Sequence, residues 1–209
     1  AIIFSSLTIL SLPVLFNYKS KVINIEKNFY KKFKIYLKSS GKITYKPFPK
    51  PHLLVENASL NLSENSKTDD FINTSNLKIY ITLRDIYYRS FDNLVSTEIT
   101  DTNLNITIHD LIKIRKHLYQ NINNPIILKN CKVFLRNKKN DVILISPIRK
   151  ITYNINNKNK IKKFSISAEI FGLNFKSEWK KNYLNPKTIL HYIDIFNPNI
   201  EIKNTLKTS

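Results

Sequence analysis

The chain of 209 residues carries 34 lysines and arginines against 15 aspartates and glutamates, a net charge of +19. One cysteine excludes an internal disulfide and a zinc site of clustered thiolates, and two glycines leave no room for a glycine-rich phosphate loop. A charge of this sign favours anionic partners, either nucleic-acid phosphates or lipid headgroups.

Residues 1–18 are predicted to be a transmembrane anchor whose beginning is missing. Residues 1–16 carry no charge, and about 20 apolar residues are needed to cross the hydrocarbon core. A signal peptide is the alternative, but its apolar region should be shorter and end at a small-residue cleavage site. We therefore expect an uncleaved anchor, and a chain that is a piece of a longer protein.

Residues 19–40 are predicted to form a basic amphipathic helix, which Gly41 ends. The apolar residues, spaced as on one helix face, are Val22, Ile25, Phe29, Phe33 and Leu37. The lysines of another face, candidates for contact with a membrane surface, are Lys27, Lys31, Lys34 and Lys38. This helix is predicted to lie along a membrane surface. The alternative, that its apolar residues pack on the sheet that follows, is compatible with that position.

Residues 41–209 alternate between apolar and polar side chains, as strands with one apolar face do. The clearest apolar series are Leu77, Ile79, Ile81 and Leu83; Leu104, Ile106 and Ile108; and Phe164, Ile166, Ala168 and Ile170. Further strands are predicted around residues 43–45, 133–135, 151–155, 173–179 and 189–195. This region is therefore predicted to be mostly antiparallel β.

Two short helices are predicted to interrupt the strands, at residues 83–88 and 110–122. A tight turn is predicted at Phe171 and Gly172, and a polar loop at residues 63–75.

A proline-opened strand recurs along the chain. Pro51, Pro125 and Pro198 each precede an apolar segment that leads to an asparagine, and they are 125 − 51 = 74 and 198 − 125 = 73 residues apart. Proline suits the start of a strand because it has no N–H to contribute to the ladder. The spacing predicts a repeated unit of several strands.

No catalytic motif is evident in the sequence. The histidines are scattered, and His109 and His117 are two helical turns apart, roughly 12 Å, which is too far to share a metal ion. Cys131 lies on a predicted strand and is interpreted as a small buried side chain. We expect no enzyme, no cofactor and no metal site.

The order of these features resembles the AsmA family of bacterial envelope proteins. The likeness consists of an amino-terminal anchor, a basic helix ending in SSGKI, a proline-opened strand in PFPKPHLLVENASLNL, and a strand, short helix and strand in LKIYITLRDIYYRSFDNLVSTEITDTNLNI. It covers most of the chain. Known family members are much longer.

The resemblance implies an inner-membrane protein whose body, residues 41–209, faces the periplasm. It implies a bent antiparallel sheet that forms an apolar groove from repeated multi-strand units and binds or conducts phospholipid in outer-membrane biogenesis. Phospholipids and the membrane surface are the implied partners, with other envelope proteins in addition. The candidate groove residues are Leu77, Ile79, Ile81, Leu83, Leu104, Ile106, Ile108, Phe164, Ile166 and Ile170.

Three alternatives remain open. The protein could be an envelope scaffold that moves no lipid. A basic run, formed by Arg149, Lys150, Lys158, Lys160, Lys162 and Lys163, is compatible with nucleic-acid binding, but no nucleic-acid-reading motif accompanies it. The alternating apolar residues could also be the closed core of a β-sandwich, because the period is the same.

Overall fold

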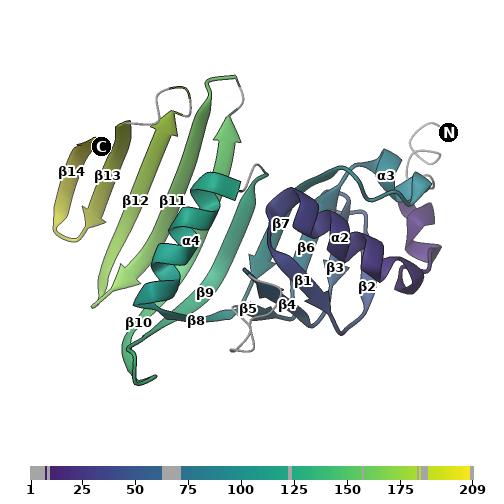
Figure 1. Ribbon diagram of the computed structural model, residues 1–209, viewed down its shortest axis with the longest axis horizontal. Helices are drawn as coiled ribbons and strands as arrows, with labels where there is room; N and C mark the ends of the chain where they lie inside the picture. Colours follow the sequence, from purple (N-terminus) through teal and green to yellow (C-terminus); the bar gives the residue numbers. More distant parts are fainter. Residues whose placement is uncertain are drawn as a thin grey trace. The chain divides into compact units, whose positions relative to one another are not determined.

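The computed structural model describes residues 8, 10–62, 72–121, 124–156, 158–182, 184 and 188–207, and for residues 115–121 only the backbone is considered. The chain divides into two compact units, Ala1–Ile99 and Thr100–Ser209, called unit 1 and unit 2 below. Strands dominate both units, helices are few, and most strand pairs are antiparallel (Figure 1). The predicted mostly β, largely antiparallel fold class is confirmed.

The predicted anchor lies partly outside the described residues, namely at 1–7 and 9. Within the rest of it, Leu12–Leu15 forms the short 3-10 helix η1, and the Tyr18 hydroxyl donates to the Pro13 carbonyl at 2.8 Å. Among the described residues, no helix is both long enough and apolar enough to cross a bilayer.

Helix α2, Val22–Phe33, follows the 3-10 helix η2, Lys19–Lys21, which is one turn long. Its residues Ile25, Phe29 and Phe33 share one face and are fully buried, so this apolar face packs within unit 1. The predicted basic helix therefore exists in its first part, and its apolar face packs on the protein.

The predicted end of this helix at Gly41 is wrong. Lys34 takes a left-handed conformation with φ 55°, and its N–H donates to the Tyr30 carbonyl, which ends the helix at Phe33. Leu37 continues the four-residue spacing, but it lies in strand β1, Tyr36–Ser39.

In unit 1, three pairs of consecutive strands each have one strand in a three-stranded sheet and the other in the larger sheet. β1 leads to β2, Ile43–Lys46; β3, His52–Val55, leads to β4, Ala58–Asn61; and β5, Ile72–Thr74, leads to β6, Leu77–Ile81. β1, β4 and β5 form a three-stranded sheet, while β2, β3 and β6 pair antiparallel, with β7, Leu94–Thr100, beside β6. Of the predicted polar loop, residues 63–71 lie outside the described residues, and Ile72–Thr74 forms β5.

Gly41 lies where β1 passes into β2, eight residues beyond the end of α2. The Ser40 N–H donates to the Asn57 carbonyl at 3.2 Å, and the Glu56 N–H donates to the Lys42 carbonyl at 3.0 Å. A Cβ atom on Gly41 would lie 2.3 Å from the carbonyl oxygen of Glu56. The residue is thus needed for close backbone approach.

We expect Gly41→Ala to destabilise unit 1 by about 1–3 kcal/mol, because backbone atoms must move to admit the methyl group. Gly172→Asn is the control, since a Cβ at Gly172 meets no atom within 4 Å and asparagine tolerates its φ of +78°. Urea unfolding curves measure both changes. Equal stability of the Gly41→Ala variant and the wild type would contradict the close approach.

The core of unit 1 lies on one face of the sheet formed by β2, β3, β6 and β7. Leu77, Ile79 and Ile81 of β6 point to the same face as Leu53 and Val55 of β3, and all five are buried. Figure 1 shows α2 lying across these strands. The predicted alternation over residues 77–81 is confirmed.

Both predicted helices are present; a threonine side chain caps the start of each, and in α4 the bonds form a complete capping box. α3, Leu83–Tyr88, has the predicted bounds, and α4, Ile108–Asn121, begins two residues before the predicted start. The Thr82 hydroxyl accepts from the Asp85 N–H at 3.3 Å, and the Thr107 hydroxyl accepts from the Asp110 N–H at 3.2 Å. The Asp110 carboxylate in turn accepts from the Thr107 N–H at 2.9 Å.

Unit 2 opens with a parallel pair and continues as an antiparallel meander. β8, Asn103–Thr107, leads through α4 to β9, Ile126–Arg136, which runs parallel to it. Each later strand is antiparallel to the one before it. These strands are β10, Val142–Asn156; β11, Ile161–Ile170; β12, Leu173–Asn182; β13, Thr188–Phe196; and β14, Asn199–Lys207. The tight turn at Phe171 and Gly172 is confirmed between β11 and β12.

The proline-opened strands are also present, since Pro51, Pro125 and Pro198 directly precede β3, β9 and β14. Their pairings differ. β3 has antiparallel neighbours, β9 pairs parallel with β8 and antiparallel with β10, and β14 pairs with β13. The spacing of 73 to 74 residues therefore does not mark one repeated pairing pattern.

Candidate functional site

Register separates the side chains of β11 to β14 into an apolar face and a polar face. Directly opposite residues of antiparallel strands point to the same side of a sheet, and Phe164 lies opposite Trp179, which lies opposite His191. On β11 to β14 the apolar face carries Phe164, Ile166, Ala168, Ile170, Leu173, Phe175, Trp179, Ile189, Ile193, Ile195, Ile200, Ile202 and Leu206. The polar residues that interrupt it are Lys162, Ser177, Lys181, His191 and Asn204.

The apolar face continues onto β8, β9 and β10, although the in–out alternation of side chains is interrupted once in β9 and once in β10. Ile148 lies opposite Ala168 and Ile151 opposite Ile166, so β10 gains one residue at a bulge around Arg149. β9 changes its alternation at the same level, where Asn130 has φ 52°. The apolar residues of β9 and β10 on both sides of this interruption therefore lie on the apolar face of the sheet. Leu104 and Ile106 of β8 lie on it as well.

The polar face holds the acidic residues of the described strands β11 to β14, namely Glu169, Glu178, Asp194 and Glu201. Glu178 accepts from the ammonium groups of Lys163 at 2.8 Å and Lys180 at 2.9 Å. Burial alone would raise the pKa of Glu178, but these two bonds outweigh it and hold the pKa below its ordinary value. Glu178 on this face is thus paired with two lysines.

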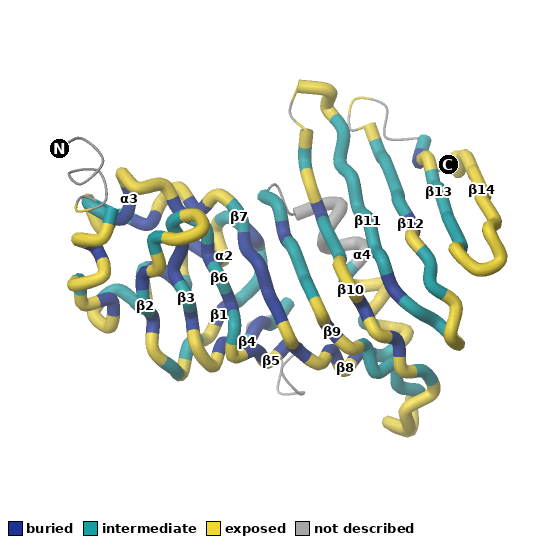
Figure 2. The backbone as a smooth tube through the Cα atoms, turned by 180° about the vertical axis from the view of Figure 1, so that it is seen from behind, coloured by how far each residue is buried: buried dark blue, intermediate teal, exposed yellow. Residues whose placement is uncertain are grey.

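The apolar face is buried at β8 and exposed at β14, while on β13 Ile189 is still buried. Figure 1 shows α4 across the neighbouring strands of unit 2, and Leu104, Ile106, Cys131, Ile148 and Tyr153 are buried there. Every residue of β14 is exposed, as the view from behind also shows (Figure 2). Ile106 is 5% exposed, whereas Ile202 is 39% exposed. The same face is therefore closed at one edge and open at the other.

The structure brings together only some of the predicted groove residues. Leu104, Ile106, Phe164, Ile166 and Ile170 share the apolar face of unit 2. The register also adds residues that were predicted only as strand positions, among them Phe175, Trp179 and Ile193.

The other predicted groove residues lie elsewhere. Leu77, Ile79 and Ile81 belong to the closed core of unit 1. Leu83 and Ile108 are not strand residues, because each begins a helix, and they are 38% and 57% exposed. The prediction that they continue an alternating strand is wrong, because Thr82 and Thr107 cap the helices α3 and α4 at these points. The sequence contains this signal as two Thr-x-x-Asp segments.

The predicted membrane-surface lysines do not share one helix face. Lys27 and Lys31 are exposed on α2, Lys34 follows its end with its ammonium group 5.5 Å from the Tyr30 ring centroid, and Lys38 lies in β1. The basic run of unit 2 is divided as well, because Lys162 points to the apolar face and Lys163 to the polar face.

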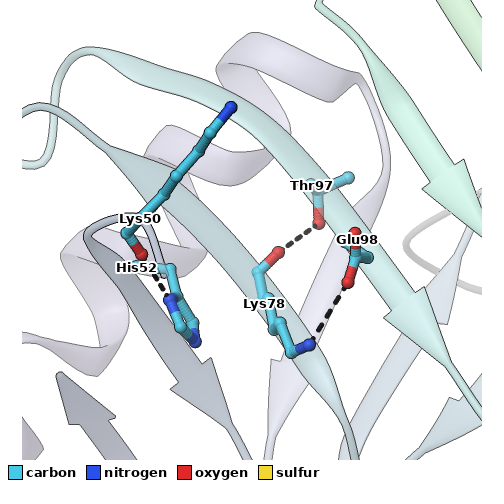
Figure 3. Close-up of polar contacts among 5 residues, drawn as sticks. All are labelled: Lys50, His52, Lys78, Thr97 and Glu98. Atoms are coloured by element: carbon cyan, nitrogen blue, oxygen red, sulfur yellow. Dashed lines mark hydrogen bonds and ion pairs between the residues drawn. The ribbon is translucent and has the colours of Figure 1, made fainter. Parts of the chain in front are cut away.

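His52, Lys78 and Glu98 lie on the face of the unit 1 sheet opposite the core, whereas Thr97, directly opposite Ile79, points to the core face (Figure 3). The Lys78 ammonium lies 3.2 Å from a carboxylate oxygen of buried Glu98, and the Thr97 hydroxyl donates to the Lys78 carbonyl at 3.1 Å. His52 is buried, its ring centroid lies 5.5 Å from that of Tyr80 at a tilt of 44°, and it donates through Nδ1 to the Lys50 carbonyl at 2.7 Å. These contacts pair polar groups of β3, β6 and β7 with one another.

Burial lowers the pKa of His52 below its ordinary value of 6.5, although the bond to the Lys50 carbonyl opposes this effect. Because the folded state disfavours the charged ring, stability is present above about pH 6.5 and is lost as pH falls toward the lower folded pKa. We expect His52→Asn to lose less stability than the wild type between about pH 7.5 and about pH 5.5.

Thermal unfolding at the two pH values measures this difference. His109→Asn is the control, because His109 is exposed. An unchanged pH dependence in His52→Asn would contradict a buried neutral ring.

Cys131 is buried, and its thiol donates to the Lys129 carbonyl at 3.3 Å. Burial raises the pKa of this thiol, so it suits the predicted role of a small buried side chain. Within the described part of the chain, no three His, Cys, Asp or Glu side chains are close enough together to hold a metal ion.

The apolar face of unit 2 is thus the surface with the clearest functional character. Comparison with known proteins adds no assignment, since no protein-family model and no curated protein matches the chain.

Proposed function

We propose that the apolar face of unit 2 binds the acyl chains of phospholipids, in a noncatalytic, membrane-anchored envelope protein similar to the AsmA family. One observation carries the proposal: a sheet of unit 2 presents a nearly continuous apolar face whose outermost strand, β14, is exposed. Ile200, Ile202 and Leu206 of β14 are all exposed on it.

Acyl chains suit such a face for a physical reason. They make no hydrogen bonds, and burial of apolar area against them is favourable by about 25 cal/mol per Å² without any specific partner. An apolar patch of this kind on a folded protein marks an interaction surface. The opposite face, with Glu178 held between Lys163 and Lys180, suits contact with water.

The AsmA resemblance supports a lipid as the occupant, and with it an inner-membrane location, a periplasmic body and a part in outer-membrane biogenesis. A scaffold whose apolar face is covered by another envelope protein is the competing function. Nucleic acid is less suited, because the basic run of unit 2 does not form one surface.

Photo-crosslinking distinguishes these functions. A photoreactive amino acid replaces Ile193 or Ile202, which are opposite each other on the apolar face, or Tyr192 or Lys203, which are the adjacent pair on the polar face. Membranes containing radiolabelled phospholipid are then irradiated. We expect lipid adducts at positions 193 and 202 and only background at positions 192 and 203.

Protein adducts in place of lipid at positions 193 and 202 would favour the scaffold. Equal lipid labelling on both faces would contradict a groove, because it would reflect general contact with the membrane.

A further inference from the structure

Three polar side chains lie next to one another on the apolar face of unit 2. Ser177 is in β12, His191 in β13 and Asn204 in β14. His191 is directly opposite Trp179 on one side and Asn204 on the other, so these side chains point to the same face. The Ser177 Oγ lies 2.9 Å from the His191 Nε2. We call Ser177, His191 and Asn204 the polar triplet.

The hydrogen bond between Ser177 and His191 has a defined direction. Ser177 is 4% exposed, and a buried hydroxyl that donates to nothing costs free energy. Its acceptor is the Nε2 atom of His191, which therefore carries no hydrogen. Burial lowers the pKa of His191 below its ordinary value of 6.5, so the ring is neutral at about pH 7. The one ring hydrogen is then on Nδ1.

The polar triplet keeps two donors that a ligand can use. Among the described residues, no hydrogen bond engages the Nδ1 of His191 or the side-chain amide of Asn204. His191 is half-buried and Asn204 is exposed, so both are reached from the open edge of the apolar face. Trp179 stacks on the His191 ring with centroids 4.6 Å and planes 12° apart, which fixes the plane of the ring. Oriented donors on an apolar surface select a ligand with an acceptor at their level.

An acyl ester carbonyl has the chemistry that these donors require. It is an acceptor attached directly to an acyl chain. It is also uncharged, which suits a partly buried site because a charged group would lose its water there. Next to the polar triplet, the apolar face continues through the opposite pairs Ile193 with Ile202 and Ile195 with Ile200. An acyl chain can therefore follow these strands away from the donors.

We propose that His191 and Asn204 donate hydrogen bonds to the ester carbonyl of a lipid whose acyl chain lies along Ile193 and Ile195. This inference rests on the proposed lipid-binding function and names the part of the lipid that is recognised. Ser177 is a positioning residue, because its bond to Nε2 holds the ring hydrogen on Nδ1. The site thus distinguishes lipids by the linkage of their chains.

The test compares diacyl phosphatidylglycerol with its dialkyl ether analogue, which has the same chain lengths and headgroup but no carbonyl groups. Each unlabelled lipid competes with radiolabelled phospholipid for crosslinking at position 202 of the purified full chain in detergent micelles.

The variant is Ser177→Ala/His191→Phe, which removes the Nδ1 donor and keeps a ring beside Trp179. Both residues change together, since Ser177 alone would lose its acceptor. The control is Tyr192→Phe, which removes a hydroxyl from the polar face.

We expect the wild type and the control to bind the ester lipid about three- to tenfold more tightly than the ether analogue, as one net hydrogen bond allows. In the variant this ratio should fall to about one. The wild-type comparison needs no change in the polar triplet, so it tests the site even where the variant is less stable.

Each other outcome contradicts a defined part of the inference. Equal binding of both lipids by the wild type would overturn the carbonyl site and leave the acyl-chain groove. An ester preference that the variant keeps would show that His191 is not the donor. Release of fatty acid from the ester lipid by the wild type, but not by the variant, would make Ser177 and His191 a hydrolytic pair instead. No competition by either lipid would overturn the proposed function together with this site.

Discussion

Replacing Ile79 by Asp is expected to unfold unit 1. Ile79 is 0% exposed in the middle of β6, between Leu53 of β3 and Thr97 of β7. An aspartate there would place a carboxylate among apolar side chains, which costs about 4 kcal/mol or more. Stabilities of small domains are only about 5–15 kcal/mol, so the folded population should fall sharply. Loss of amide protection in β3 and β6, followed by hydrogen exchange, measures the effect.

Val95→Asp is the matched control for this prediction. Val95 lies in the neighbouring strand β7 but is exposed, so an aspartate there keeps its water and should change stability by less than about 1 kcal/mol. Retained amide protection in the Ile79→Asp variant would show that β6 faces an open surface, as the groove interpretation of Leu77, Ile79 and Ile81 requires.

The strands were predictable because a period of two is written directly into the sequence. Residues 77–81 and 164–170 alternate in the same way, yet Ile79 lies in a closed core and Ile166 is only half-buried. The period reports which side chains share a face and carries no information about what covers that face. The division of the groove candidates between two units therefore required the tertiary structure.

The helix starts could have been placed from the sequence alone. Thr82 and Asp85, and likewise Thr107 and Asp110, have the spacing of a capping box. Each box directly follows an alternating apolar series, so Leu83 and Ile108 continue the strand pattern by one more step while already lying in a helix. The local hydrogen bonds of the boxes decide against the strand.

Two other features had no comparable signal. Phe33 and Leu37 are four residues apart, as on a helix, but Lys34 adopts a left-handed conformation that glycine or asparagine more often takes. In β9 and β10 the alternation changes at Asn130 and Arg149, and only the pairing of the two strands shows that the apolar side chains remain on one face.

The open edge of unit 2 leads to a prediction that separates a core from a binding surface. Ile106→Asp and Ile202→Asp make the same chemical change on the same apolar face. Ile106 is covered, so the carboxylate should cost about 4 kcal/mol or more and unfold unit 2. Ile202 keeps access to water on edge strand β14, so its cost should be only about 1 kcal/mol.

The single tryptophan of the chain, Trp179, lies in β12, so its fluorescence reports unfolding of unit 2. We expect the Ile106→Asp variant to lose the folded signal, and the Ile202→Asp variant to unfold close to the wild type while its phospholipid crosslinking from position 193 falls to background. A folded protein that no longer takes lipid is the outcome that a binding surface requires, because acyl chains avoid a charge that the protein itself tolerates. Unfolding of both variants would mean that β14 belongs to a closed core, and the apolar face would then have no room for a lipid.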